Sequence, residues 1–487
     1  MSKRGPTPGQ AEGCRSAHFL FYVAGRLKYS PTSIRKPDLL GATILDLQAN
    51  EAHNYTAISI GPGSNDGGWN DTITTQVWLP LDNWNGRFQG LGGGGYSTGF
   101  GPIYLTYAVA QGFASASTDG GVPGAPEVVT TIATDLSWAL SSENNVDWFL
   151  LENYAFKATS DMAEIGKQVT KSFYNRPVEY SYFSGCSGGG RQNLAMAQRF
   201  PGAFDGILAV APAINIERFI PAGYWPTLVM NQNDIYPSPC EIDAFVSATA
   251  NACDGLDGIE DGIISLPHLC NVTAFDFIGQ HYTCNDTQHS LSASGAKVVQ
   301  SAWSGSGKRG YLGVNKGATL SSLYIPTVCS ANNTCHSPGS PFFGNWISYF
   351  VAKNLEFALD EMSEVEFFKA LAVSKTDYAS MLAANNPDLS EFKAQGGKMI
   401  TWHGLADEAI TIDGLIEYYT EVLETDAKAD DFFRFFEAPG VGHCFGGLGP
   451  VPNGALAHAT ARDLCPYPLQ QRYIGGDPRE AKSFTCV

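Results

Sequence analysis

Two kinds of apolar pattern alternate along this chain: short apolar runs, and longer segments in which apolar residues recur every three or four positions. The first kind predicts β-strands and the second predicts α-helices. Strands are predicted at 75–79, 87–91, 180–183, 206–211, 398–401 and 432–437. Helices are predicted at 144–174, 191–200, 412–423 and 453–463. Strands that alternate with helices indicate an α/β fold with a mostly parallel central sheet.

The alternation is interrupted between about residues 215 and 395. This interval is rich in loops and aromatic residues, and it holds six of the eleven cysteines. A chain of 487 residues is long enough for one large domain with a substantial insertion. We therefore predict that residues 1–214 and 396–487 form one α/β domain, and that residues 215–395 form a lid domain inserted into it.

Composition and charge narrow the possible partners. The chain is 44% hydrophobic and 16% charged, which is typical of a globular enzyme. Its net charge of −18 would repel nucleic acids and anionic lipid surfaces. No apolar run approaches the roughly 18 residues of a membrane-spanning helix. We expect a neutral small molecule or polymer as the partner, with neither nucleic acid nor membrane involved.

The cysteines and the glycosylation sequons indicate an oxidising, extracellular environment. Residues 1–15 carry no signal-peptide pattern, which disagrees with that indication. Secretion is nevertheless the expectation that we keep. The five sequons lie in stretches predicted to be turns or loops, at Asn54, Asn70, Asn271, Asn285 and Asn332.

The segment Gly185-Cys186-Ser187-Gly188-Gly189 matches the nucleophile elbow of α/β-hydrolases. In that motif a strand turns sharply into a helix, and the serine hydroxyl projects above the sheet. The predicted strand at 180–183 and the predicted helix at 191–200 supply this context. A glycine-rich chain can also contain such a pentapeptide by chance, so the assignment depends on the partner residues.

Partner residues for the serine occur in the order that α/β-hydrolases require, which is serine, acid, histidine. Asp407 follows the predicted strand 398–401, and His443 follows the strand 432–437. His443 would take the proton of Ser187, and Asp407 would orient the imidazole. His403 is the rival base and Glu408 the rival acid.

Two backbone N–H groups are expected to bind the oxyanion of the tetrahedral intermediate. Gly188, directly after the serine, would supply one. The other is expected in the loop after an early strand, where residues 92–95 are four consecutive glycines. Gly93 and Gly94 are the candidates, although the run could also be a simple glycine turn.

Two cysteines flank the candidate residues: Cys186 precedes Ser187, and Cys444 follows His443. A disulfide between them would hold the serine and histidine backbones side by side, because bridged Cα atoms lie roughly 5.5–6 Å apart. The alternative is a pair of free, buried thiols beside the site.

Several longer segments resemble the fungal tannase and feruloyl esterase family, and the resemblance spans residues 77–487. It rests on WLPLDNWNGRFQGLGGGG (78–95), SYFSGCSGGGRQ (181–192), FDGILAVAPA (204–213), HGLADE (403–408) and GVGHC (440–444). The resemblance implies an α/β-hydrolase fold with a large lid. It also implies a disulfide that links the catalytic serine and histidine regions, which transfers to Cys186 and Cys444.

The resemblance further implies a structural Ca²⁺ ion in the lid and no organic cofactor. The segment CDGLDGIEDGII (253–264) is similar to the calcium loop of the family. Transferred by position, the ligands are the carboxylates of Asp254, Asp257 and Asp261 and the carbonyls of Ile259 and Ile263. Closely spaced carboxylates and free carbonyls suit a hard cation. A solvated acidic turn is the alternative.

The remaining cysteines divide into two groups. By resemblance, Cys253 pairs with Cys270 and Cys465 with Cys486. Counting cysteines leaves the pairing open for Cys240, Cys284, Cys329 and Cys335.

Our leading functional hypothesis is that the chain is a serine esterase acting on aromatic acid esters, such as gallate or hydroxycinnamate esters, either free or linked to a plant polymer. One alternative is an intracellular acyltransferase or lactone-forming enzyme with the same triad, and another is a catalytically silent hydrolase-fold binding protein. Aromatic residues of the lid could form the acyl pocket or the lid core, namely Tyr224, Trp225, Tyr324, Phe342, Phe343 and Trp346.

Overall fold

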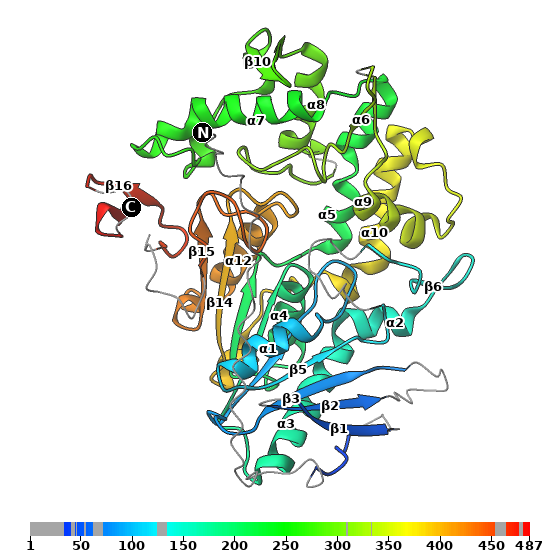
Figure 1. The fold of residues 1–487 in the computed structure, drawn as a ribbon, viewed down its shortest axis with the longest axis vertical. Coiled ribbons are helices and arrows are strands. Elements are labelled where there is room, and N and C mark those ends of the chain that lie inside the picture. Colours follow the sequence, from blue (N-terminus) through cyan, green and yellow to red (C-terminus); the bar gives the residue numbers. More distant parts are fainter. Residues whose placement is uncertain are drawn as a thin grey trace, which may run out of the picture.

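A nine-stranded sheet forms the centre of the structure, which is a computed structural model (Figure 1). The structure describes residues 34–39, 44, 46–52, 55–61, 72–123, 134–307, 310–332, 334–452, 464–476 and 481–487. The strand order is β1-β2-β3-β5-β4-β8-β9-β14-β15. In chain order the strands are β1 (Asp46–Ala52), β2 (Tyr55–Gly61), β3 (Thr75–Pro80), β4 (Arg87–Leu91), β5 (Ala114–Thr118), β8 (Tyr180–Cys186), β9 (Gly206–Val210), β14 (Lys398–Gly404) and β15 (Phe433–Ala438).

The six strands from β5 to β15 are parallel, whereas β1, β2 and β3 pair in antiparallel fashion at the other edge. Parallel strands bring their carboxyl ends to the same edge of the sheet, which is where α/β proteins bind ligands. The segments that follow β4, β8, β14 and β15 therefore come together. These are the segments that contain the residues predicted to act in catalysis.

Helices cover both faces of the sheet. Val77 and Leu79 of β3 point to one face of the sheet, into the core that the sheet shares with α3 and α4. Trp78, which lies between them in sequence, points to the opposite face, against α1. This alternation follows the period of two along a strand. The helices of this part of the chain are α1 (Pro102–Ala110), α2 (Trp148–Glu152), α3 (Ala158–Tyr174), α4 (Gly188–Arg199), α11 (Ser390–Ala394) and α12 (Asp413–Thr425).

A second group of helices lies between β9 and β14 in sequence and gathers beyond the carboxyl edge of the sheet, at the top of Figure 1. Its hydrophobic core is continuous and is distinct from the core beneath the sheet. The helices are α5 (Ile216–Ala222), α6 (Trp225–Asn233), α7 (Pro239–Cys253), α8 (Ala293–Ser304), α9 (Pro341–Trp346) and α10 (Glu364–Leu382).

The end of the predicted lid packs with the α/β part rather than with the lid helices. Ala384, Leu389 and Phe392 belong to the core beneath the sheet. Conversely, Trp138, Leu151 and other residues of the segment before α3 contribute to the lid core. Each part therefore contributes residues to the hydrophobic core of the other. This packing anchors the lid in addition to its two chain connections.

Most predicted elements occur within a few residues of their expected bounds, but the helix predicted at 144–174 is divided. A short strand, β7 (Asn145–Val146), precedes α2, and a π-helical turn (Asn153–Lys157) separates α2 from α3. Asp147 caps α2 by accepting the N–H of Leu150, which explains why the helix starts there. The helix predicted at 453–463 lies outside the described residues.

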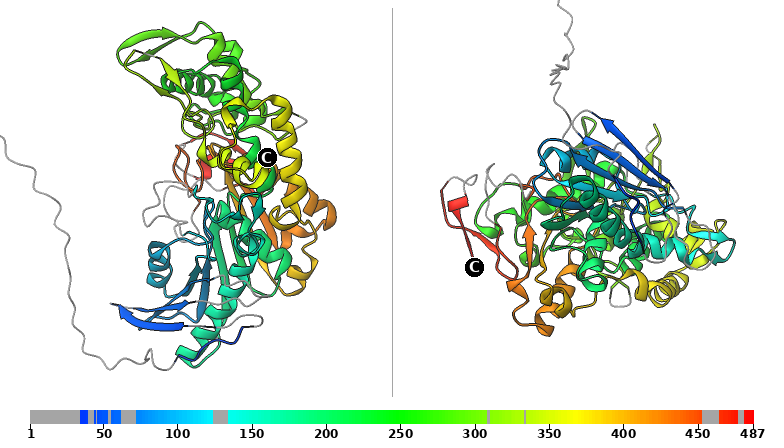
Figure 2. Two further views of the ribbon diagram at one scale, coloured as in Figure 1. Left: turned by 90° about the vertical axis from the view of Figure 1, so that its right-hand side faces the viewer. Right: turned by 90° about the horizontal axis from the view of Figure 1, so that it is seen from below.

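Small two-stranded sheets complete the fold, and disulfides fix three of them. The pairs are β6 (Leu140–Ser142) with β7, β10 (His281–Cys284) with β11 (Thr287–Ser290), β12 (Val328–Cys329) with β13 (Cys335–His336), and β16 (Gln471–Tyr473) with β17 (Phe484–Cys486). Figure 2 shows the β10–β11 hairpin at the far end of the lid. No helix among the described residues has the length and apolar character that a bilayer-spanning segment needs.

Five disulfides are present among the described residues. The predicted pairs Cys186–Cys444, Cys253–Cys270 and Cys465–Cys486 all form. The pairing that cysteine counting left open is Cys240 with Cys284 and Cys329 with Cys335.

Candidate active site

Ser187 lies at the turn between β8 and α4, with φ of 63° and ψ of −122°. A non-glycine residue in this region is strained, and such strain marks many functional sites. Hydrogen bonds hold the turn in place: the Ser187 N–H donates to Val210 O (3.0 Å), and the Ser187 carbonyl accepts the N–H groups of Arg191 and Ala213. The end of β9 therefore buttresses the elbow, as the sharp strand-to-helix turn requires.

Glycines around Ser187 allow close backbone contact. A Cβ atom on Gly185 would lie 2.7 Å from the carbonyl carbon of Gly189, and one on Gly189 would lie 2.7 Å from Gly93 O. The Gly189 N–H donates to that same carbonyl at 2.8 Å. The elbow and the glycine loop at 92–95 thus pack against each other with no room for side chains.

Asp407 occupies the turn after β14, and its two carboxylate oxygens have different partners. Oδ1 accepts the N–H groups of Ala409 and Ile410, both at 2.8 Å. Oδ2 lies 2.9 Å from His443 Nδ1 and 2.9 Å from His403 Nε2. The carboxylate is thus fixed by its own turn and oriented toward two imidazoles.

Electrostatics favour the charged forms of both members of this pair. Burial alone would raise the pKa of Asp407, but the two histidines and their hydrogen bonds hold it well below its ordinary value. Burial would likewise lower the pKa of His443, yet the Asp407 charge and hydrogen bond leave that pKa raised. Asp407 therefore stabilises the imidazolium that forms when His443 accepts a proton.

The rival residues have other positions. His403 Nε2 also lies 3.1 Å from Ile410 O, and its side chain is fully buried, whereas 13% of the His443 side chain is exposed. A base that exchanges protons with a substrate must be reachable, which favours His443. The Glu408 carboxylate accepts the main-chain N–H of His443 at 3.0 Å. It thus contacts the backbone of the histidine, while Asp407 contacts the ring.

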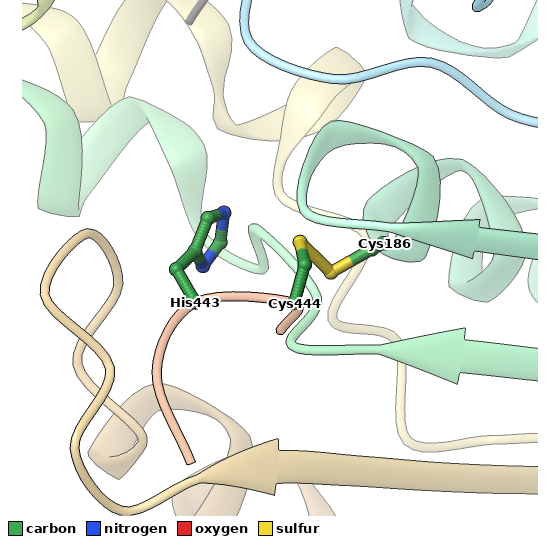
Figure 3. Close-up of side chains that lie close together, drawn as sticks. All are labelled: Cys186, His443 and Cys444. Atoms are coloured by element: carbon green, nitrogen blue, oxygen red, sulfur yellow. A yellow bond between two sulfur atoms is a disulfide. The ribbon is translucent and has the colours of Figure 1, made fainter. Parts of the chain in front are cut away.

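The Cys186–Cys444 disulfide connects the elbow to the histidine loop, as Figure 3 shows. The two Cα atoms are 5.9 Å apart although 258 positions separate them in sequence. A ring nitrogen of His443 and the two sulfur atoms lie within 4.8 Å of one another. Because the sulfurs are bonded to each other, they are not thiolate metal ligands. The bond instead joins the residue before Ser187 to the residue after His443.

A hydrogen bond within the fold argues against one of the predicted oxyanion donors. The Gly93 N–H donates to Gln192 Oε1 at 3.1 Å, so it is already occupied. Gln192 Nε2 also donates to Thr98 O at 3.0 Å, and this fully buried amide therefore connects the glycine loop to the segment that follows it. Gly94 Cα lies 3.3 Å from the position of a Cβ on Gly188, so these two candidates are adjacent. Their role in binding an oxyanion stays a prediction.

The lid contributes a hydrogen bond to the acid turn. Tyr324 donates its hydroxyl hydrogen to Ala409 O at 3.1 Å, two residues after Asp407. Trp225 is partly buried, and the other aromatic residues considered for an acyl pocket are less than 9% exposed; all pack in or against the lid core. Their packing favours a structural role over a pocket lining.

The proposed calcium loop is compact, and its carboxylates bond to its own backbone. Asp254 accepts the N–H groups of Asp261, Gly262 and Ile263 at 2.8–3.2 Å. Asp257 is 5% exposed and accepts the N–H of Ile259. The three carboxylates do not lie within 4.8 Å of one another. Among the described residues, the one such group of potential ligands is Cys186, His443 and Cys444. The donor types suit calcium, but binding would require these side chains to turn inward.

Sequence reasoning missed Gln192 as a contributor to the site, and it named Tyr324 only as a candidate for the acyl pocket or the lid core. Gln192 lies on the first turn of α4, one turn after Ser187, which was the available signal for a residue facing the glycine loop. Tyr324 had no comparable signal, since its partner Ala409 is 85 positions away.

Comparisons with known proteins agree with this geometry. Residues 63–458 match the family model described as "Tannase and feruloyl esterase". A probable feruloyl esterase of Arthroderma benhamiae is 36% identical over 457 residues, which cover 86% of this chain and 83% of the relative. A probable feruloyl esterase B-2 of Aspergillus terreus is 30% identical, with 92% and 80% covered.

Solved structures of similar shape include a tannin acyl hydrolase from Aspergillus niger, with a TM-score of 0.82, 25% identity and coverage of 94% of this chain and 93% of the other. Feruloyl esterase B from Aspergillus oryzae has a TM-score of 0.73 and 24% identity over 92% and 97% of the two chains. The second likeness concerns the fold alone. The α/β-hydrolase fold with its parallel sheet is thereby confirmed.

Asp407→Asn should lower the pKa of His443, because the variant removes the negative charge that favours the imidazolium. The imidazole would then lose its proton at a lower pH than in the unaltered protein. Titration of ¹³C-labelled histidines by NMR measures this, with His443→Gln identifying the signal. An unchanged titration midpoint in Asp407→Asn would show that Asp407 does not set the charge of His443.

Proposed function

This chain belongs to the tannase and feruloyl esterase family, and on that premise we propose that it hydrolyses esters of phenolic acids, such as gallate or hydroxycinnamate esters. It is a carboxylic ester hydrolase. The observation that carries the proposal is the hydrogen-bonded Asp407–His443 pair, which the Cys186–Cys444 disulfide links to the residue that precedes Ser187. We assign Ser187 as the nucleophile, His443 as the base and Asp407 as the acid.

The reaction proceeds in two halves. His443 takes the proton of Ser187 Oγ as this oxygen bonds to the ester carbonyl carbon. The tetrahedral intermediate expels the alcohol, which leaves with the proton from His443, and an acyl-Ser187 ester remains. Water, deprotonated by His443, then attacks that ester, and His443 returns the proton to Ser187 Oγ as this oxygen leaves, which releases the phenolic acid and free Ser187. The N–H groups of Gly188 and Gly94 are our candidates to stabilise the oxyanion.

The identity of the acceptor separates a hydrolase from an acyltransferase. Both would form the same acyl-Ser187 ester, and they differ only in whether water or an alcohol attacks it. The tannin acyl hydrolase and the feruloyl esterases named above favour water. A binding protein without activity is disfavoured because Asp407 is hydrogen-bonded to His443, and a disulfide ties the residue after His443 to the residue before Ser187.

The purified protein should release ferulate or gallate from the methyl esters, and Ser187→Ala should lower kcat roughly a millionfold. Chromatography of the products, with and without a competing alcohol, measures both the activity and the acceptor. A fluorophosphonate probe should label the unaltered protein and not the variant. Labelling without release of either acid would reject the substrate class but keep the nucleophile. New esters formed in preference to free acid would favour the acyltransferase.

We also propose that the loop from Asp254 to Ile263 binds a structural Ca²⁺ ion. Three carboxylates and the carbonyls of Ile259 and Ile263 supply the hard oxygen ligands that calcium prefers. Asp257 is buried within the loop, so a cation bound by its carboxylate would be shielded from solvent. The Cys253–Cys270 disulfide limits how far the loop can open, which would keep the candidate ligands near one another while their side chains turn inward.

Calcium should stabilise the folded protein, by about 2.7 kcal/mol at a free concentration 100 times the Kd. Thermal unfolding in CaCl₂ and in EGTA measures the effect as a difference between the two midpoints. Asp257→Asn should abolish the difference, while Glu260→Gln, an exposed position of the same loop, should retain it. Equal midpoints in CaCl₂ and EGTA for the unaltered protein would reject the site.

We further propose that the protein acts outside the cell and carries N-linked glycans. Five disulfides support an oxidising environment. Asn271, Asn285 and Asn332 lie in exposed turns or loops, where a glycan can be accommodated. The sequons at Asn54 and Asn70 lie outside the described residues.

A further inference from the structure

Two consecutive acidic residues hold different parts of His443. Asp407 accepts a hydrogen bond from the imidazole at 2.9 Å, and Glu408 accepts one from the main-chain N–H at 3.0 Å. Both come from the turn after β14, which is fixed by hydrogen bonds from Ala406 N–H to Val441 O and from Leu405 N–H to Ala438 O. The same turn therefore holds both the ring and the backbone of the histidine.

The backbone beside His443 fits closely around the Glu408 carboxylate. A Cβ on Gly442 would lie 3.0 Å from Glu408 Oε2, so a side chain there would displace the carboxylate. Within the loop, Gly442 N–H donates to Gly446 O, and Phe445 N–H donates to His443 O. The His443 N–H points out of this loop toward Glu408 instead. Loss of the carboxylate would leave that donor unpaired in a half-buried site, which is unfavourable.

The disulfide alone does not define the position of the imidazole. It restrains Cys444, the residue after the histidine, and the two backbone dihedrals of His443 could still rotate the ring relative to Ser187. A hydrogen bond to the His443 N–H restrains the peptide on the other side of the residue. Together, the disulfide and the carboxylate fix both flanks of His443.

We propose that Glu408 is a positioning residue, which fixes the main chain of His443 so that the imidazole stays within reach of Ser187. The inference rests on the proposed function, because it assumes that His443 is the base. Glu408 itself does not contact the substrate in this proposal. Its role differs from that of Asp407, since it acts on the peptide and not on the ring.

Charge gives Glu408 a second, separable effect. The groups that face His443 are Asp407 and Glu408, with His403 and Tyr324 contacting the acid turn from the sheet and from the lid. Asp407 raises the pKa of His443 most among these groups, and Glu408 adds to it. Because the base works only when neutral, activity should rise as pH increases through this pKa. Removing the Glu408 charge should move that rise to lower pH.

Two variants separate geometry from charge. Glu408→Gln keeps an oxygen that can accept the His443 N–H but removes the charge, so kcat should stay within about threefold while the acid limb of kcat/KM moves to lower pH. Glu408→Ala removes both, so kcat should fall by roughly 10- to 100-fold with little change in KM, because the imidazole is misplaced. Glu424→Gln, an exposed carboxylate on α12, is the matched control and should leave both quantities unchanged.

Rates are measured with p-nitrophenyl acetate from pH 4 to 9, and the rate of fluorophosphonate labelling is measured in parallel. Use of a simple acetate ester keeps the result independent of the phenolic substrate class. If the unaltered protein hydrolyses this ester but no phenolic ester, the substrate proposal fails while the Glu408 inference is still tested. An equal kcat in Glu408→Ala and in the unaltered protein would overturn the inference. So would a loss of kcat in Glu408→Gln as large as that in Glu408→Ala, with no shift of the acid limb of kcat/KM.

Discussion

The Cys186–Cys444 disulfide is the constraint on which the rest of the site depends. Ser187 follows β8, and the His443 loop follows β15, which lies three strands further along the sheet because β9 and β14 intervene. Neighbouring strands are about 4.8 Å apart, so the two strand ends are separated by about 14 Å. The histidine loop must cross the ends of β14 and β9 to reach the elbow. The covalent bond to Cys186 fixes the end of that crossing.

Noncovalent contacts define the path of the loop across the sheet. Its backbone passes so close to the end of β14 that a Cβ on Gly404 would lie 2.1 Å from Val441 O. The turn after β14 then presents Asp407 to the ring and Glu408 to the peptide of His443. On the other side of Ser187, Gln192 fixes the glycine loop by bonding to Gly93 and Thr98. The strained elbow thus lies between the histidine loop and the glycine loop, and hydrogen bonds hold each of these loops in place.

The sequence predicted the chemistry of the site better than its supporting contacts. Ser187, Asp407 and His443 could be found because their order and their placement after strands follow from the fold. The assignment of Gly93 did not take account of a buried amide, Gln192, that accepts its N–H, because no sequence pattern reveals that contact. The predictions also omitted β1, β2, β5 and α1: β5 is the small-residue run ASAST, which lacks the bulky apolar residues that mark a strand. The contact of Tyr324 with Ala409 depends on tertiary packing of the lid, which local patterns do not encode.

Replacing both disulfide cysteines, in Cys186→Ala/Cys444→Ala, tests most directly whether this bond creates the site. Circular dichroism should show an intact fold, while kcat/KM for p-nitrophenyl acetate should fall by roughly 100-fold or more as His443 moves away from Ser187. Cys329→Ala/Cys335→Ala, which removes a disulfide of the lid, is the control and should retain activity. A folded Cys186→Ala/Cys444→Ala protein with unaltered kcat/KM would contradict the account, because the noncovalent contacts would then suffice to hold serine and histidine together.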